Sequence, residues 1–226
     1  MGLDAPRHSG DVGAGGRQIA TVPEDERSRA AHAIKRALDV VLASVLLALA
    51  APVLALAWIA IRLESPGAAI YRQRRVGRGG RDFDLLKLRT MVKGAEGMGA
   101  GLAVDEDDPR ITRTGALLRR FSLDELPNLV NVLAGEMSIV GPRPTVRVQV
   151  EQYTPRQLGR LAVEPGITGW AQVSGRAALP WRERIELDLW YIEHWSLWLD
   201  LRILVRTARL LLSGKGLYRG ETGGWR

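Results

Sequence analysis

The sequence predicts an α+β fold that is mostly helical and associated with a membrane. Residues 40–61 form a run of 22 residues without a charged side chain. At ~1.5 Å per residue, a helix of this length reaches across a hydrocarbon core of ~30 Å. Residues 70–83 alternate strand-forming side chains with glycine-rich turns, and residues 181–213 show helical spacing. We therefore expect a membrane helix, a small strand-containing domain and C-terminal helices.

Length and composition limit the classes of function. A chain of 226 residues can hold one sizeable domain and an appendage. It contains no cysteine, which excludes disulfides, thiolate metal sites and a cysteine nucleophile. The net charge of +7 and the isoelectric point near 10.3 predict anionic partners. Nucleic acid, an anionic membrane surface and phosphorylated substrates all fit, and composition does not choose among them.

Residues 1–27 are rich in glycine, proline and charge and lack apolar periodicity. Too little apolar surface is present to offset the entropy of ordering, so we expect a disordered tail. The tail is not a signal peptide, because the first apolar run begins only near residue 40 and is longer than a signal-peptide core.

We expect residues 28–64 to form the membrane helix. Basic residues flank its apolar run, with Lys35 and Arg36 before it and Arg62 after it. The positive-inside rule would keep both ends in the cytoplasm. Pro52 removes a backbone hydrogen bond near the middle of the run and bends the helix. A re-entrant helix hairpin broken at Pro52 satisfies both facts, and a single kinked span is the alternative.

Lys35, Arg36 and Asp39 stand at the entrance to the apolar run. Asp39 follows Lys35 by four residues, the spacing of a helical ion pair. They also suit a membrane anchor, with the cations meeting lipid phosphates while Asp39 ties the helix to the soluble domain. The two interpretations are compatible.

Residues 62–93 are strongly basic, with nine Lys or Arg against three Asp or Glu. We expect a basic hairpin that lies against anionic headgroups or lines a phosphate site. Nucleic acid is the competing partner. Tyr71 and Phe83 are the only aromatic residues of this segment, which weakens the case for base stacking.

The candidate site is the carboxylate pair Asp124 and Glu125, which lies between Arg119 and the Gly-Pro-Arg-Pro turn that holds Arg143. Carboxylates among guanidinium groups suit phosphate chemistry, because arginine binds phosphoryl oxygens while a carboxylate holds a cation or attacks phosphorus. The motif from Ser122 to Glu125 also has the form of a helix capping box.

Two proline and glycine signals set the boundaries of the helix that follows. Pro127 favours a start near itself, which leaves both acids at a helix N-terminus, and Gly135 marks the end. A second glycine-rich region, residues 165–176, ends at Arg176, which could clamp a diphosphate. This region has neither a dinucleotide-binding nor a P-loop spacing.

The C-terminal part, residues 181–213, is rich in tryptophan. Trp181, Trp190, Trp195 and Trp198 lie within eighteen residues, which predicts an aromatic belt at the membrane interface. Residues 199–212 predict an amphipathic helix lying in the interface plane, with a core-packing helix as the alternative.

Several ordered segments together resemble the bacterial sugar transferases, the monotopic phosphoglycosyl transferases that start polysaccharide and glycoconjugate assembly on a polyprenyl phosphate carrier. The resemblance covers roughly residues 32–218. It rests on KRALD (35–39), YRQRRVGRGGRDFDLLKLRTM (71–91), the block at 108–144, PGITGWAQVSGR (165–176) and the tryptophan-rich C-terminal segment.

The resemblance implies roles for the candidate residues. Asp124 aligns with the nucleophile of the family and Glu125 with its magnesium ligand, while Arg119, Arg143 and Arg176 are candidates for contacts to phosphate or nucleotide. It also implies the re-entrant helix and a member without a four-helix membrane domain in front. Residues 65–226 would then form a small catalytic domain with interfacial amphipathic helices, at the cytoplasmic face of the bacterial cell membrane.

The expected reaction is transfer of a sugar-1-phosphate from a nucleoside diphosphate sugar, a UDP-sugar, to polyprenyl (undecaprenyl) phosphate. It would use Mg²⁺ and a covalent phosphosugar on Asp124. Membrane lipids are expected partners, nucleic acid is not, and a homodimer is compatible with the sequence. Two alternatives are direct metal-assisted transfer without a covalent step and a non-catalytic, membrane-associated binder of anions.

Overall fold

The computed structural model describes residues 26–95, 98, 108–175 and 179–213. The expected tail lies outside the described residues except for residues 26–27, and Arg176 lies outside them as well.

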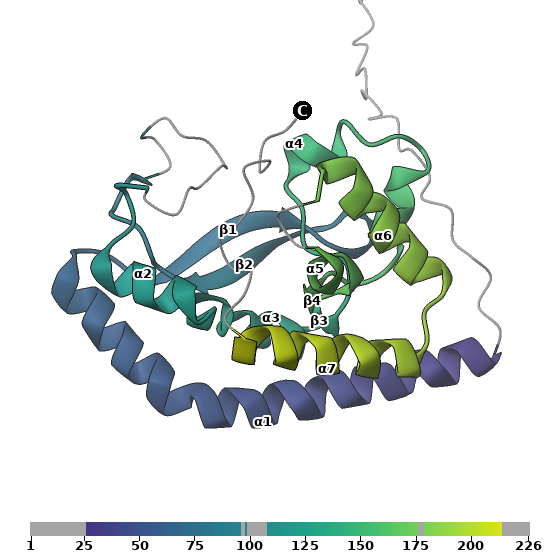
Figure 1. Ribbon diagram of the computed structural model, residues 1–226, viewed down its shortest axis with the longest axis horizontal. Helices are drawn as coiled ribbons and strands as arrows, with labels where there is room; N and C mark the ends of the chain where they lie inside the picture. The colour runs from purple at the N-terminus through teal and green to yellow at the C-terminus, as the bar shows by residue number, and fades with distance from the viewer. Residues whose placement is uncertain (1–25, 96–97, 99–107, 176–178, 214–226) are drawn as a thin grey trace, which may run out of the picture.

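The longest element is helix α1, Glu26–Glu64, which contains Pro52. Figure 1 shows α1 running along one edge of the molecule and bending, so that its C-terminal part rises beside the remaining elements. The helix continues through Pro52, and the expected break is therefore wrong: the proline leaves the helix continuous. The helix is long and apolar enough to cross a membrane, and 11% of its most apolar 18-residue window is buried within the protein.

The basic segment forms the predicted hairpin. Strand β1, Ile70–Val76, pairs antiparallel with β2, Asp82–Leu88. Ile70 lies opposite Leu88 and Val76 lies opposite Asp82. The 3-10 turn η1, Arg78–Gly80, joins the strands. Phe83 and Leu85 lie on one face of β2 and are buried in the main core, whereas Leu88 lies on the other face and is buried against Ala57 and Ile61 of α1.

Short helices and a two-stranded parallel sheet complete the domain. In the sheet, β3 (Ser138–Val140) pairs with β4 (Gly166–Thr168). The helices are α2 (Arg113–Arg120), η3 (Leu123–Glu125), α3 (Asn128–Ala134), α4 (Arg147–Val150), η4 (Gln157–Ala162), α5 (Trp170–Ser174), α6 (Trp181–Glu193) and α7 (Leu197–Ser213).

The main hydrophobic core joins α1 to the elements that follow it in the chain. It contains Ala43 of α1, Phe83 of β2, Val132 of α3 and Ile203 of α7, together with Met137 before β3. Their burial fixes the middle of the long helix against the rest of the chain. Other apolar residues of α1 stay exposed, such as Leu49, Leu56 and Leu63.

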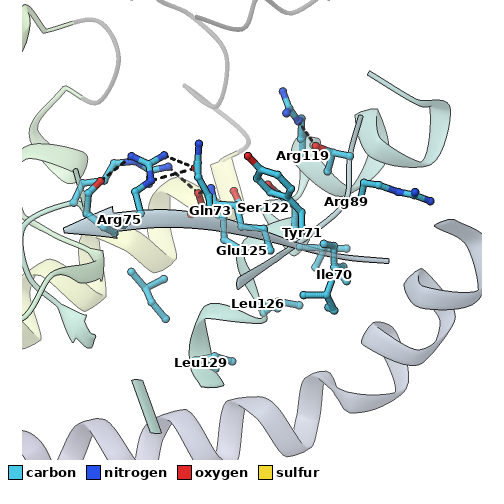
Figure 2. A pocket seen from close by; sticks show the side chains of 18 of the residues that line it. Ile70, Tyr71, Gln73, Arg75, Arg89, Arg119, Ser122, Glu125, Leu126 and Leu129 are labelled. Carbon is cyan, nitrogen blue, oxygen red and sulfur yellow. Dashed lines mark hydrogen bonds and ion pairs between the residues drawn. The ribbon is translucent and has the colours of Figure 1, made fainter. Parts of the chain in front are cut away.

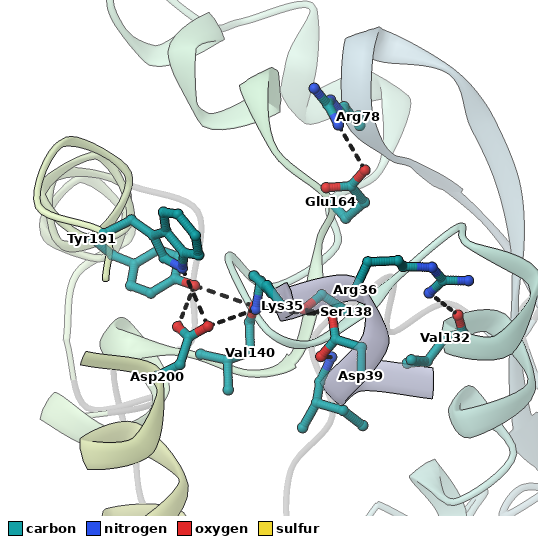
Figure 3. Close-up of polar contacts among 12 residues, drawn as sticks. Lys35, Arg36, Asp39, Arg78, Val132, Ser138, Val140, Glu164, Tyr191 and Asp200 are labelled. Carbon is teal, nitrogen blue, oxygen red and sulfur yellow. Dashed lines mark hydrogen bonds and ion pairs between the residues drawn. The ribbon is translucent and has the colours of Figure 1, made fainter. Parts of the chain in front are cut away.

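Polar contacts tie the N-terminal part of α1 to the domain (Figure 3). The carboxylate of Asp39 accepts hydrogen bonds from the Ile139 N–H at 3.0 Å and from the Ser138 hydroxyl at 2.7 Å. This is the attachment expected of Asp39. Lys35 donates to Asp200 at 2.7 Å and to the Val140 carbonyl at 3.0 Å.

Arg36 donates to the carbonyl oxygens of Val132 and Leu133, at the C-terminal end of α3. Lys35 and Arg36, which were expected to meet lipid phosphates, therefore contact protein groups. Their long side chains reach back from α1 to the domain because acceptors from distant parts of the sequence lie there.

The tryptophans of the C-terminal segment are partly buried or exposed, and the interfacial belt stays a prediction. Trp190 stacks on Trp170 with ring centroids 5.3 Å apart, and Trp195 donates to Asp200 at 3.2 Å. Trp198, at 66% exposure, is the largely exposed one. On α7, Ile203 is buried while Leu201, Val205 and Leu211 are exposed, so the helix has apolar side chains on both its inner and outer faces.

Candidate active site

The carboxylate pair lies on η3, at a reversal of the chain. Ser122 adopts a left-handed conformation, with φ of +54°, and its side chain caps no helix. The capping box is therefore not formed. Helix α3 begins at Asn128, directly after Pro127, and ends before Gly135, whose φ of +82° closes it. Both signals read from the sequence are confirmed, and they leave Asp124 and Glu125 just ahead of α3.

Asp124 and Glu125 line a large open groove of about 1670 Å³. Figure 2 shows the side chains of Tyr71, Gln73 and Arg75, from β1, beside Glu125. One part of the groove is strongly cationic and suits a phosphorylated ligand. The basic residues lining it are Arg72, Arg75, Lys87, Arg89, Lys93, Arg110, Arg119, Arg143, Arg160 and Arg184.

Glu125 is held by two cations. One of its oxygens, Oε1, accepts hydrogen bonds from Lys87 Nζ at 2.7 Å and from the Arg143 guanidinium at 2.8 Å. Burial acts to raise the pKa of Glu125, but the charges of Arg143 and Lys87 outweigh it and hold this pKa well below its usual range. Glu125 is therefore a fixed anion at neutral pH.

Asp124 differs from Glu125 both in its contacts and in the direction of its pKa shift. Among the described residues its carboxylate has no hydrogen-bond or ion-pair partner, although Lys87, Arg119 and Arg143 act on it at longer range. Burial and the neighbouring charge of Glu125 raise the pKa of Asp124 above its ordinary value. A carboxylate without a partner, placed in a cationic groove, is available to react.

Arg119 reaches the groove from α2. Its Nε donates to the Thr90 hydroxyl at 2.8 Å. Helix α2 can approach Thr90 closely because Gly115 faces the Thr90 backbone, where a Cβ atom would overlap the carbonyl group. No local sequence pattern predicts this packing.

Arg143 is positioned by the turn that carries it. The Arg160 guanidinium donates to the Arg143 carbonyl at 2.8 Å, and the Arg75 guanidinium donates to the Pro144 carbonyl at 3.2 Å. Arg160 is itself buried in an ion pair with Asp188, with Nε and Oδ2 2.7 Å apart. Burial and the nearby Arg143 lower the pKa of Arg75 to about 10, so Arg75 stays cationic at neutral pH.

The structure thus brings together four of the five predicted site residues, namely Asp124, Glu125, Arg119 and Arg143. The sequence analysis missed Lys87, Arg75, Arg160 and Asp188. Lys87 and Arg75 lie in the basic hairpin, which was predicted only as a whole to line a phosphate site. The strand register of the structure is needed to tell these two residues from the other basic residues of the hairpin. No local signal marks Arg160 or Asp188, because their contacts join distant segments.

Comparison with known proteins decides the family. A model of the bacterial sugar transferase family matches residues 30–214. The chain belongs to the bacterial sugar transferase family.

Similar members act with different sugars. This sugar transferase is 44% identical over 220 residues to the UDP-glucose:undecaprenyl-phosphate glucose-1-phosphate transferase of Caulobacter vibrioides. The match covers 93% of this chain and 82% of the relative. It is 44% identical over 189 residues to the UDP-N-acetylgalactosamine-undecaprenyl-phosphate N-acetylgalactosaminephosphotransferase of Aeromonas hydrophila, covering 81% of this chain and 44% of the longer relative. It is 38% identical over 198 residues to the exopolysaccharide production protein ExoY of Rhizobium meliloti, covering 81% of this chain and 88% of the relative.

The sugar transferase is therefore a phosphoglycosyl transferase enzyme, which excludes the non-catalytic alternative. Among the described residues, no group of three or more His, Cys, Asp or Glu side chains could enclose a metal ion. The adjacent carboxylates of Asp124 and Glu125 nevertheless fit Mg²⁺, which is often bound by one or two carboxylates with substrate phosphates and water as its other ligands.

Proposed function

We propose that this sugar transferase moves a sugar-1-phosphate from a UDP-sugar to undecaprenyl phosphate through a covalent phosphosugar on Asp124. The observation that carries the proposal is the unpartnered carboxylate of Asp124 beside the doubly paired Glu125. The names of the relatives support undecaprenyl phosphate as acceptor and a nucleoside diphosphate sugar as donor.

In the first step, a carboxylate oxygen of Asp124 attacks the phosphorus bonded to the sugar. A new oxygen–phosphorus bond forms on Asp124, and the bond to the bridging oxygen breaks, so that uridine monophosphate leaves with that oxygen. Arg119 and Arg143, which line the same groove as Asp124, would bind the phosphoryl oxygens and stabilise the charge that develops on them.

In the second step, an oxygen of undecaprenyl phosphate attacks the same phosphorus. The bond to Asp124 breaks, which returns the free carboxylate and gives undecaprenyl diphosphosugar. Every nucleophile and leaving group is an anion, so the reaction needs concentrated positive charge. The basic residues of the groove meet this need.

Glu125 would hold Mg²⁺ together with the donor diphosphate. When bound, the ion neutralises charge on the leaving phosphate. Lys87 and Arg143 keep Glu125 ionised for this role. Both cations contact Oε1 of its carboxylate, which fixes the orientation of that group.

A re-entrant topology at the cytoplasmic face is supported by the attachment of both ends of α1 to one domain. Near its start, Lys35 and Asp39 contact the domain. Near its end, Arg89 donates to the Ser65 carbonyl at 2.8 Å, and Glu64 accepts from the Arg113 N–H at 2.8 Å. A helix that crosses a bilayer would leave its two ends on opposite sides.

Release of nucleoside monophosphate tests the proposed function. The purified enzyme would be given a panel of UDP-sugars with undecaprenyl phosphate and Mg²⁺. We expect release of uridine monophosphate, with the same amount of undecaprenyl diphosphosugar, for at least one sugar and none for Asp124→Asn. Equal release by Asp124→Asn would contradict the assignment of Asp124. The panel also identifies the sugar, because the relatives include enzymes for glucose and for N-acetylgalactosamine.

Direct metal-assisted transfer is the second candidate. It uses the same substrates but predicts no adduct on Asp124. The doubly paired Glu125 would serve either route as a magnesium ligand, whereas the unpartnered Asp124 favours the covalent route.

A further inference from the structure

The groove continues past the carboxylates toward the membrane helix. Figure 2 shows Glu125, Leu126 and Leu129 one below the other, in the direction of α1. Leu126 and Leu129 line the same groove as Asp124. The cationic part of the groove therefore opens directly into an apolar part, which begins one residue after Glu125.

Helix α1 forms one wall of this apolar part through Leu42, Leu46, Leu49 and Val53. These residues are spaced by four, three and four positions, which places them on one face of the helix. The wall they form is roughly 16 Å long at ~1.5 Å per residue.

Helix α7 also lines the groove, through Leu204, Thr207 and Leu211. The ion pair between Lys35 and Asp200 ties α1 to α7.

We propose that this apolar part of the groove binds the isoprenoid chain of the acceptor, over the units nearest its phosphate. The proposal rests on the proposed function and adds a binding site for the tail. The acceptor is an apolar chain with an anionic head, and the groove has apolar walls leading to a cationic end. Binding the chain along α1 directs the acceptor phosphate toward Asp124, which makes the groove a positioning device as well as a source of affinity.

The wall is accessible to an apolar ligand. Leu46 is 39% exposed, Leu49 is 71% exposed and Val53 is 40% exposed. A chain lying against these side chains would remove apolar surface from contact with water or disordered lipid. Ordinary membrane lipids are the competing occupant, because their acyl chains could cover the same surface.

The absence of cysteine allows a direct test of occupancy. Leu49→Cys places a thiol in the groove. Leu56→Cys is the matched control, because Leu56 lies on the same helix, is 69% exposed and does not line the groove. Each variant would be alkylated in detergent micelles with added undecaprenyl phosphate or phosphatidic acid. We expect undecaprenyl phosphate to slow alkylation of Leu49→Cys at least fivefold and to leave Leu56→Cys unchanged.

Three results of this experiment would overturn the proposal. Unchanged alkylation of Leu49→Cys would show that the chain does not bind there. Equal protection of both positions would show general shielding by the micelle. Equal protection of Leu49→Cys by phosphatidic acid would assign the groove to ordinary lipids.

Kinetics supply a second measurement. Leu49→Trp fills the groove, so we expect the preference in kcat/KM for undecaprenyl phosphate over a two-isoprene monophosphate to fall about tenfold. Leu56→Trp should keep the preference of the parent enzyme. An unchanged preference in Leu49→Trp, or an equal loss in both variants, would contradict the tail site.

The cysteine experiment stays informative if the covalent mechanism is wrong, because it measures binding without turnover. Failure of the mechanism would appear as a missing Asp124 adduct in the parent enzyme. Failure of the tail site would appear as unprotected Leu49→Cys in an enzyme that still forms the adduct.

Discussion

Asp124 and Glu125 are neighbours in the sequence, yet their surroundings act on them in opposite directions. Lys87 and Arg143 lower the pKa of Glu125. Burial and the charge of Glu125 raise the pKa of Asp124. A raised carboxylate pKa accompanies greater basicity, which favours attack on phosphorus, whereas a permanently ionised carboxylate suits cation binding. The different roles of the two acids thus follow from the partners of each one.

The pH dependence of the first half-reaction should report on Asp124. Asp124 must be ionised to attack, so activity falls as the pH drops through its pKa. Arg119 stabilises the ionised form, and Arg119→Gln should therefore move the acid limb to higher pH. Uridine monophosphate release would be measured against pH without acceptor and at fixed Mg²⁺. Arg120→Gln is the matched control, because Arg120 lies against Phe121 instead. Equal acid limbs in the parent and Arg119→Gln would contradict the account.

Arg160 should matter for stability as well as activity. Its ion pair with Asp188 is almost completely buried, at 3% and 2% side-chain exposure. Arg160→Gln leaves the charge of Asp188 buried without its partner, so we expect a loss of about 3–5 kcal/mol in the free energy of unfolding. Chemical denaturation of the detergent-solubilised enzyme would measure it.

The exposed pair of Arg156 and Glu186 provides a control for Arg160. Arg156→Gln should cost much less stability than Arg160→Gln, because solvent screens an exposed ion pair. Equal losses of stability in the two variants would contradict the larger contribution that we assign to the buried pair of Arg160 and Asp188.

At the scale of elements, helix α2 is placed by its contact with the end of β2. Gly115→Ala would drive a methyl group into the Thr90 carbonyl, so α2 must move and Arg119 must move with it. We expect a loss of roughly 1–3 kcal/mol in stability, together with reduced activity. Gly159→Ala is the control, because its Cβ would meet Leu189 at an ordinary 3.4 Å. Thermal unfolding and turnover of both variants check this, and a fully active, stable Gly115→Ala enzyme would contradict it.

Elements with local signals could be predicted from the sequence. The glycine-rich turn fixes the hairpin β1–β2, and Pro127 and Gly135 bound α3. In each case, the backbone restriction of a single residue decides where the element starts or ends. The capping box did not form: Ser122 adopts a left-handed conformation in place of the extended one typical of an N-cap, and its side chain makes no capping hydrogen bond.

Long-range contacts could not be predicted in this way. Lys35 pairs with Asp200, which lies 165 residues further along the chain. Trp195 was predicted to belong to an aromatic belt at the membrane interface, and in the structure it donates a hydrogen bond to Asp200. A lysine ammonium group or a tryptophan indole can interact with the lipid interface or with a distant carboxylate. The pattern of residue types along the sequence does not show which of these two partners the side chain has.

For the whole molecule, one domain holds both ends of a long apolar helix. The same helix supplies a wall of the groove that contains Asp124. This arrangement would place the reacting carboxylate at the membrane surface, where a soluble sugar nucleotide and a lipid-bound phosphate can meet. The membrane helix thus contributes to the substrate site as well as to attachment.

Cysteine labelling tests the re-entrant topology. Ala33→Cys and Leu63→Cys place single thiols at exposed positions near the two ends of α1. We expect both to react with a membrane-impermeant maleimide in inverted vesicles and neither to react in intact cells whose outer membrane has been permeabilised. Labelling of the two positions from opposite sides would restore the single kinked span.

The central claim is that Asp124 carries the phosphosugar. The enzyme would be mixed with its UDP-sugar and Mg²⁺ without acceptor, quenched rapidly and examined by mass spectrometry. The account predicts a mass increase of one phosphosugar on the peptide that contains Asp124, absent in Asp124→Asn and discharged when undecaprenyl phosphate is added before the quench. An enzyme that turns over with acceptor but forms no such adduct would contradict the claim and establish direct transfer.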